Sequence, residues 1–277
     1  MTITQDIATL QSLVEEATEQ PDLLASPAHR AAVEEAIAGL DRGELRMAEK
    51  TGDEWIVHAW IQQAILLYFQ LTEMRTMHAG PLEFYDRIPL KQDLEQRGIR
   101  VIPGGITRYG AHIEPGVVVM PGFVNIGAYV ATGAMVDTWA TVGSGAQIGR
   151  NVHLAGGVGI GGVLEPVGAR PVIVEDDAFI GSRCIVVEGV IVEEGAVLGA
   201  QVALSASTHI IDVTGDEPVT YQGRVPAGSI VIPGTRTRTF TAGDFQVACA
   251  LIIGRRNNRT EQKLLPMDAA RAFGFSL

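Results

Sequence analysis

The central part of the chain repeats every six residues, and this period constrains the fold more than any other feature. An aliphatic residue stands at every sixth position over two stretches. These positions are Val118, Val124, Val130, Val136, Val142, Ile148, Leu154 and Ile160, and then Val174, Ile180, Val186, Val192, Leu198, Leu204 and Ile210. A helix cannot explain a period of six, and the two-residue alternation of a hairpin sheet would not single out every sixth residue.

A second stripe of mostly small residues lies two positions before the aliphatic ones. It consists of Gly116, Gly122, Ala128, Ala134, Ala140, Ala146, Val152 and Val158, and then Ala178, Cys184, Val190, Ala196, Val202 and Thr208. Short strands joined by tight turns and stacked coil upon coil explain both stripes, because like positions then lie on like positions. The aliphatic residues would fill the interior of the column, and the small ones would fit its corners.

The repeat breaks once, between Ile160 and Val174. These residues are 14 positions apart where 12 would keep the phase, which predicts two extra residues. We interpret the segment Gly161 to Gly168 as a loop extruded from the column, which caps a groove, reaches a neighbouring subunit or forms a harmless bulge. Its glycines resemble a nucleotide-binding loop only superficially, because no helix is expected after them.

The first hundred residues lack this repeat and are expected to be helical. Apolar residues at Ile7, Leu10, Val14 and Ala17 follow helical spacing. A second helix is expected after Ser26 and Pro27, which offer an N-cap and a proline at the first helical position.

Two further elements are expected before the repeat begins. The sequence Thr51-Gly52-Asp53 predicts a hairpin turn, and residues 55–71 are apolar enough for a buried core helix. The expected organisation is an N-terminal helical domain at 1–100, a repeat domain at 101–235 and a C-terminal segment at 236–277.

Composition limits the partners of the protein. The chain carries 32 acidic and 21 basic residues, a formal net charge of −11, which argues against nucleic acid and an anionic membrane surface. Two cysteines are too few for a disulfide framework and fit a reducing compartment. The first residues lack the basic end of a secretory leader. We therefore expect a cytoplasmic protein whose partner is a small molecule or another protein.

Residues that violate the repeat are the candidates for function. Asp137 and Trp139 place a carboxylate and a large aromatic ring in a run of small residues, and Trp139 would project outward, either walling a cleft or packing on the helical domain. Glu188 is a second carboxylate, which either shares the proton transfer and substrate positioning with Asp137 or is solvated surface. His153 stands at an outward-pointing position beside Leu154, and similarity to hexapeptide acyltransferases in which a histidine is the general base makes it an alternative base.

The hexapeptide pattern resembles that of the hexapeptide-repeat acyltransferases. Within it, the runs 135–149, 151–154 and 157–166 are similar to the tetrahydrodipicolinate N-succinyltransferase family of the diaminopimelate and lysine pathway. This resemblance implies a mainly β fold, namely a left-handed parallel β-helix with an N-terminal α-helical domain and a short C-terminal strand and helix tail. It also implies a homotrimer with active sites between neighbouring columns.

The activity that the resemblance implies is succinyl transfer from succinyl-CoA to the amino group of L-2-amino-6-oxopimelate, the ring-opened form of tetrahydrodipicolinate. The alternative is an acetyl-CoA-dependent N-acetyltransferase acting on the same or a related amino-diacid. No permanently bound cofactor is implied. A zinc site of the γ-type carbonic anhydrase kind is not expected either, because His153 has no partner histidine at hexad spacing.

The resemblance also implies roles for individual residues. Asp137 matches the acid that binds and deprotonates the amine, and Glu188 assists as a base or as an acyl acceptor. Arg100 matches a substrate-binding arginine, with Arg108 and Trp139 as further candidates. Ile185 departs from the family pattern, in which many relatives carry a glutamate.

Coenzyme A is expected in the groove between two columns. Its pantetheine would lie along the backbone near Gly162, Ser182 and Ala200. Its phosphates would meet the basic end of the chain, where residues 221–277 carry eight basic and three acidic residues. The candidates there are Arg236, Arg238, Arg255, Arg256 and Lys263.

Overall fold

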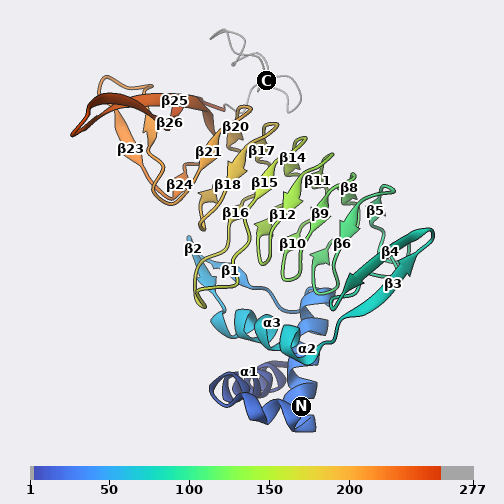
Figure 1. The fold of residues 1–277 in the computed structure, drawn as a ribbon. Helices are drawn as coiled ribbons and strands as arrows, with labels where there is room; N and C mark the ends of the chain where they lie inside the picture. Colours follow the sequence, from blue (N-terminus) through green and yellow to red (C-terminus); the bar gives the residue numbers. More distant parts are fainter. Residues whose placement is uncertain (1–2, 257–277) are drawn as a thin grey trace.

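The computed structural model describes residues 3–256. Figure 1 shows a column of short strands with three helices at one end and a long hairpin at the other. The helical end contains α1 (Ile3–Glu19), η1 (Pro21–Ala25), α2 (Pro27–Arg42) and α3 (Ala59–Leu71). Apolar side chains of α1, α2 and α3 form one buried cluster, as the helical spacing predicts.

The sequence predictions for the helices are confirmed with two corrections. Pro27 is the first residue of α2 and Ser26 is its N-cap, but the Ser26 hydroxyl makes no capping hydrogen bond. The third helix begins at Ala59 and not at residue 55, because Glu54–Val57 is a strand, β2, paired with β1 (Ala48–Thr51). The turn between β1 and β2 lies where it was predicted.

A second hairpin, β3 (Arg75–Ala79) and β4 (Leu82–Asp86), precedes the column and was not predicted. Along its described length the chain contains no helix both long enough and apolar enough to span a bilayer.

The column consists of short parallel strands that fall in turn onto three sheets, as Figure 1 shows. We name each sheet by its first strand. The β7 sheet holds β7 (His112–Ile113), β10 (Tyr129–Val130), β13 (Gln147–Ile148), β16 (Ile173–Val174), β19 (Ile191–Val192) and β24 (Arg224–Val225). The β6 sheet holds β6 (Ile106–Thr107), β9 (Phe123–Val124), β12 (Thr141–Val142), β15 (Gly159–Ile160), β18 (Ile185–Val186) and β21 (Ala203–Leu204).

The β5 sheet continues beyond the column into the C-terminal strands. Its column strands are β5 (Arg100–Val101), β8 (Val118–Val119), β11 (Met135–Val136), β14 (His153–Leu154), β17 (Phe179–Ile180) and β20 (Val197–Leu198). The added strands are β25 (Ser229–Phe240), β26 (Gly243–Arg255), β22 (Ile210–Asp212) and β23 (Val219–Tyr221). The C-terminal strand is thus a long antiparallel hairpin, and residues 257–277 lie outside the described part.

The strand register confirms the repeat as coils of three hexads. Val130 pairs with Ile148, one coil of 18 residues further on, and both side chains are buried in the core. Val118 is the exception: it faces outward beside Met135, and Val119 is the buried residue that pairs with Val136. The reason is a turn one residue shorter, because the buried Val119 and Val124 are only five positions apart.

The loop at the break is longer than predicted. Ile160 and Val174 lie on consecutive strands, so the chain takes 14 residues where six suffice elsewhere, which makes eight extra residues and not two. Helix α3 holds this loop: the buried Gln62 side chain donates to the Ala169 carbonyl at 2.9 Å and accepts from the Gly168 amide. The extra residues therefore fasten the helical end to the column.

Candidate functional site

Asp137 lies at a corner where the β5 sheet turns into the β6 sheet. The turns at this corner stack through backbone hydrogen bonds: the Gly157 amide donates to the Thr138 carbonyl at 2.8 Å, and the Gln201 amide donates to the Ser182 carbonyl at 3.0 Å. We call residues 137–139, 155–157, 181–183 and 199–201 the Asp137 edge. Because the edge is built from repeated turns, each side chain on it has a fixed height along the column.

The Asp137 carboxylate is held by its own turn and by the next coil. Its Oδ1 atom accepts the Thr138 amide at 2.6 Å and the Thr138 hydroxyl at 3.2 Å, and Oδ2 lies 3.5 Å from His153 Nε2. The Thr138 amide, with a smaller contribution from His153, lowers the pKa of Asp137 below its ordinary value. The carboxylate therefore remains ionised at neutral pH.

His153 stands on β14 with its ring between Asp137 and Phe179. The Phe179 ring meets it edge-on, with centroids 5.3 Å apart. Both members of the Asp137 and His153 pair remain partly open to solvent, with 31% and 39% of their side chains exposed. An acceptor molecule can therefore reach the carboxylate and the imidazole together. Sequence reasoning considered the two residues separately and missed this contact.

Arg100 is on the same outward face as His153. It pairs in register with Val118, which pairs with Met135, and Met135 pairs with His153. Two strand spacings separate Arg100 from the coil of Asp137, about 10 Å. The Arg100 side chain is exposed and makes no hydrogen bond or ion pair within residues 3–256. It is thus free to bind a carboxylate.

Arg108, the second arginine candidate, is already occupied. Its guanidinium forms an ion pair with Asp86 on β4 and donates to the Asn125 side chain at 3.0 Å. These contacts tie the second hairpin to the column, and they distinguish Arg108 from the unpaired Arg100.

Trp139 occupies a corner position with a left-handed backbone. Its φ angle is +61°, close to the +78° of Gly127 and the +75° of Gly145. These two glycines hold the same position within their turns, which join the β6 sheet to the β7 sheet. The side chain projects outward and is 71% exposed, so it does not pack on the helical end. Of the two sequence interpretations, only the outward-facing one is compatible with this exposure.

Glu188 lies on a different edge of the column, where the β6 sheet turns into the β7 sheet. Its Oε2 atom accepts the Ala206 amide at 3.1 Å in the turn that follows on the next coil. The same edge carries Gly162, whose position beside Ser144 leaves no room for a side chain. We call residues 143–145, 161–163 and 187–189 the Glu188 edge. One chain does not bring Asp137 and Glu188 to a common corner.

The residues predicted for coenzyme A are distributed over three places. Ser182 and Ala200 stack on the Asp137 edge, and Gly162 is on the Glu188 edge. Arg236 and Arg238 lie on the same face of β25, where the Arg238 guanidinium is 5.2 Å from the centroid of the Phe240 ring.

The other two basic candidates within the described residues have partners in the fold. Arg255 pairs with Asp212 at 2.7 Å, and Arg256 donates to the Asp177 carbonyl at 2.9 Å. Lys263 lies outside the described residues.

The family models that match this chain agree with the sequence pattern. Residues 9–71 match the family model described as tetrahydrodipicolinate N-succinyltransferase N-terminal, and residues 171–206 match the hexapeptide repeat of succinyl-transferase. A solved structure from Campylobacter jejuni, described as a 2,3,4,5-tetrahydropyridine-2-carboxylate N-succinyltransferase, aligns with a TM-score of 0.45 and 16% identity over 80% of this chain and 62% of that one.

Two curated relatives cover nearly the whole chain. The 2,3,4,5-tetrahydropyridine-2,6-dicarboxylate N-succinyltransferase of Bordetella pertussis is 52% identical over 95% of this chain and 98% of its own. The protein of the same name from Acinetobacter baylyi is 47% identical over 88% of this chain and 90% of its own. At this identity and coverage, the chain belongs to the tetrahydrodipicolinate N-succinyltransferase family.

Proposed function

We propose that this protein transfers the succinyl group of succinyl-CoA to the amino group of L-2-amino-6-oxopimelate, the ring-opened form of tetrahydrodipicolinate. The family, and the name of relatives about half identical over most of the chain, support this activity in diaminopimelate and lysine biosynthesis. The observation in this chain that carries the proposal is the solvent-accessible pair of Asp137 and His153, on one face with the unpaired Arg100.

The reaction requires a base, because an ammonium group cannot attack a thioester. In our proposal the substrate ammonium binds between Asp137 Oδ2 and His153 Nε2, and the imidazole carries its hydrogen on Nδ1. The free Nε2 atom then accepts the proton from the amine. Imidazole suits this step near neutral pH better than a carboxylate whose pKa is lowered.

The amine nitrogen then forms a bond to the thioester carbonyl carbon, and a tetrahedral oxyanion results. Its collapse breaks the carbon–sulfur bond and expels the coenzyme A thiolate. The proton held by the base passes to the thiolate, and the second proton of the former ammonium leaves the nitrogen for solvent, so that the products are the N-succinyl amino-diacid, free coenzyme A and one released proton. Arg100 is assigned to a substrate carboxylate, at a distance of about 10 Å from the Asp137 coil that suits an extended seven-carbon diacid.

We further propose a homotrimer of left-handed columns, in which the Asp137 edge of one subunit faces the Glu188 edge of its neighbour. The position of the two carboxylates on different edges of one chain supports this arrangement, because Glu188 would then reach the Asp137 site from a second subunit. Coenzyme A would lie in the groove so formed. Ser182 and Ala200 would line one side and Gly162 the other, with Arg236 and Arg238 near the phosphates.

The remaining proposals follow from the same assignment. The protein would work in the cytoplasm, with the helical, repeat and C-terminal divisions expected from the sequence. Trp139 would wall the acceptor side of the groove. Arg255 and Lys263 remain candidates for the phosphates, although the pairing of Arg255 with Asp212 makes Arg255 a weaker one than Arg238.

An assay of thiol release, with succinyl-CoA and acetyl-CoA compared side by side, tests the activity. We expect release that depends on tetrahydrodipicolinate and is faster with succinyl-CoA, together with a product heavier than the ring-opened substrate by one succinyl group. Faster turnover with acetyl-CoA would establish the alternative acetyltransferase. Native mass spectrometry tests the trimer independently, and a monomer at assay concentration would refute the shared site.

A further inference from the structure

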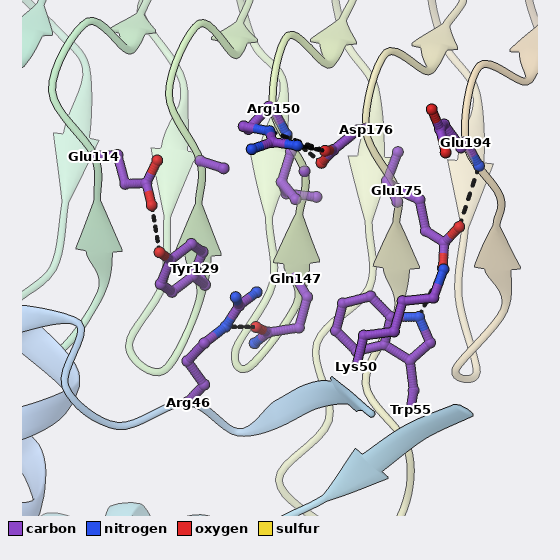
Figure 2. Close-up of a pocket in the computed structure, with 14 residues that line it drawn as sticks. Arg46, Lys50, Trp55, Glu114, Tyr129, Gln147, Arg150, Glu175, Asp176 and Glu194 are labelled. Carbon is purple, nitrogen blue, oxygen red and sulfur yellow. Dashed lines mark hydrogen bonds and ion pairs between the residues drawn. The ribbon is translucent and has the colours of Figure 1, made fainter. Parts of the chain in front are cut away.

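A cavity of about 320 Å³ lies where the segment that leads into the first hairpin crosses the β7 sheet. We call it the seam pocket, and Figure 2 shows its lining. The polar and aromatic side chains around it are Arg46, Lys50 and Trp55 from the N-terminal side and Glu114, Tyr129, Gln147, Arg150, Glu175, Asp176 and Glu194 from the column. The Asp137 edge joins the other two sheets, so the seam pocket is separate from the proposed active site.

Arg46 is the central cation of the pocket, and no acidic group binds it. Its guanidinium lies over the Tyr129 ring, 3.7 Å from the ring centroid, and its Nε atom donates to Gln147 Oε1 at 3.0 Å. Within the described residues, its two terminal nitrogens have no hydrogen-bond partner. Burial lowers the pKa of this guanidinium, although Glu49, Glu114 and Asp176 lie near enough to favour its charged form, so the charge has lost solvation without a direct ion pair in return.

Most of the other charged groups in the pocket are satisfied by one another. Glu175 accepts from both Lys50 and the Trp55 indole at 2.8 Å, and Asp176 pairs with Arg150 at 2.8 Å.

Two acidic groups of the lining remain. Glu114 accepts the Tyr129 hydroxyl, and burial together with this bond raises the pKa of Tyr129 to about 12, so that the phenol remains a donor. The Glu194 carboxylate, in contrast, has no partner within residues 3–256. The pocket therefore has one unpaired guanidinium and one unpaired carboxylate.

The charge of the lining indicates which ligand would complete it. Three basic and four acidic side chains leave one negative charge in excess. A simple anion could pair with Arg46 but would add to this excess. A molecule with one carboxylate and two ammonium groups neutralises both free groups and the excess, because a carboxylate can accept two parallel hydrogen bonds from a guanidinium. The cavity volume is at the lower end for small-molecule sites, which suits an amino acid.

We propose that the seam pocket is a second ligand site, for a cationic amino acid whose α-carboxylate pairs with Arg46. Its ammonium groups face Glu194 and the other acidic side chains of the lining, Glu114, Glu175 and Asp176, which together we call the acidic rim. The lining comes from residues 46–55, which we call the N-terminal arm, and from the column. A bound ligand therefore links the arm to the column. The ligand would therefore raise the melting temperature of the protein as well as bind to it.

Isothermal titration calorimetry on the full chain tests the site with three related probes. L-lysine carries both kinds of group, cadaverine lacks the carboxylate, and L-norleucine lacks the side-chain ammonium. We expect L-lysine to bind at least tenfold more tightly than either of the other two. Equal affinity for cadaverine would overturn the role of Arg46, and equal affinity for L-norleucine would overturn the role of the acidic rim. Absence of measurable L-lysine binding would overturn the site.

Variants locate the binding. Arg46→Met retains the packing on Tyr129 but removes the charge, and Glu194→Gln alters an exposed side chain. Each should weaken L-lysine binding at least tenfold, whereas Arg75→Met, on the exposed β3 strand, should leave it unchanged. Asp137→Asn should also leave it unchanged, and loss of binding in that variant would assign the ligand to the active site instead. Circular dichroism of each variant verifies the fold, and Glu194→Gln keeps the test valid if Arg46→Met does not fold.

Discussion

Asp137 Oδ2 lies 3.5 Å from His153 Nε2, although the two residues are 16 positions apart and belong to successive coils. The strand register explains the contact: Met135 pairs with His153, and Asp137 follows Met135 by two residues, at the turn. A carboxylate beside an imidazole on an exposed edge is an arrangement that supports proton transfer. The pair also explains why neither residue alone suffices to describe the site.

Replacing Asp137 with asparagine should remove most of the turnover. The amide is the same size but carries no charge for the substrate ammonium or for the imidazolium. We expect kcat to fall by about 100-fold or more. Succinyl-CoA binding, measured by calorimetry, should change less than threefold. A variant that retains wild-type kcat would remove Asp137 from the mechanism.

The pH profile separates the two possible bases. The Thr138 amide and His153 lower the pKa of Asp137, so this group titrates below its ordinary value of about 3.9. A fall in kcat/KM between pH 8 and pH 6 therefore does not come from Asp137, and His153→Gln, which should lose most of the activity, tests whether that fall depends on the imidazole. If kcat/KM of His153→Gln depends on pH as in the wild type, His153 is excluded as the base.

Asp137 also contributes to the stability of the fold, and this contribution is expected to be lost in acid. Because its folded-state pKa is lowered, the ionised carboxylate stabilises the fold above the unfolded value, and this contribution is lost as the pH falls through the folded value. Thermal melts of the wild type and Asp137→Asn should therefore differ most near neutral pH and converge in strong acid. A difference that grows towards acid would contradict the assignment.

Arg100→Met should act on substrate binding. Loss of a charge-assisted contact to a carboxylate costs about 1.5–3 kcal/mol, which is roughly tenfold to 100-fold in KM for the acceptor. Arg108→Met is the matched control, because Arg108 is paired with Asp86 and should affect the melting temperature more than KM. The reverse result would make Arg108 the substrate arginine.

A buried ion cluster joins α2 to the column. The Asp41 side chain is only 3% exposed and accepts from Lys91 at 2.5 Å, from Arg97 at 2.8 Å and from the Gly110 amide at 3.0 Å. Asp41→Asn should cost about 3–5 kcal/mol of the free energy of unfolding, because Lys91 remains buried without a full counter-charge. Glu35→Gln, which removes an exposed ion pair with Arg42 on the same helix, should cost less than about 1 kcal/mol. Chemical denaturation measures both.

Close stacking on the Glu188 edge makes Gly143 irreplaceable. A Cβ atom at this position would lie 2.1 Å from the Gly162 nitrogen. Gly143→Ala should therefore cost about 3 kcal/mol or displace the loop at residues 161–168. At Gly195 a Cβ would meet no atom within 4 Å, and the only cost of Gly195→Ala is its φ of +67°, about 1 kcal/mol. Equal melting temperatures of the two variants would show that the Glu188 edge can relax around a methyl group at position 143.

Local sequence explains most of the column. Each strand of the column needs a buried aliphatic residue, and this need recurs every six residues. The aliphatic stripe alone therefore identifies the coils. The error at Val118 arose because a turn one residue shorter shifts the buried position to Val119 without breaking the aliphatic pattern. The loop after Ile160 was underestimated for a similar reason: phase alone cannot distinguish two extra residues from eight, which differ by one hexad.

Contacts between distant segments were decided only by the tertiary structure. Asp137 and His153 were both recognised as candidates in the sequence, yet their contact depends on the register of successive coils. Arg46 and Gln147 are 101 positions apart and follow no common period, so the seam pocket had no sequence signal. The physical reason is that a repeat fixes neighbours one coil apart through backbone pairing, whereas the packing of the N-terminal arm on the column depends on side chains that meet only after both have folded.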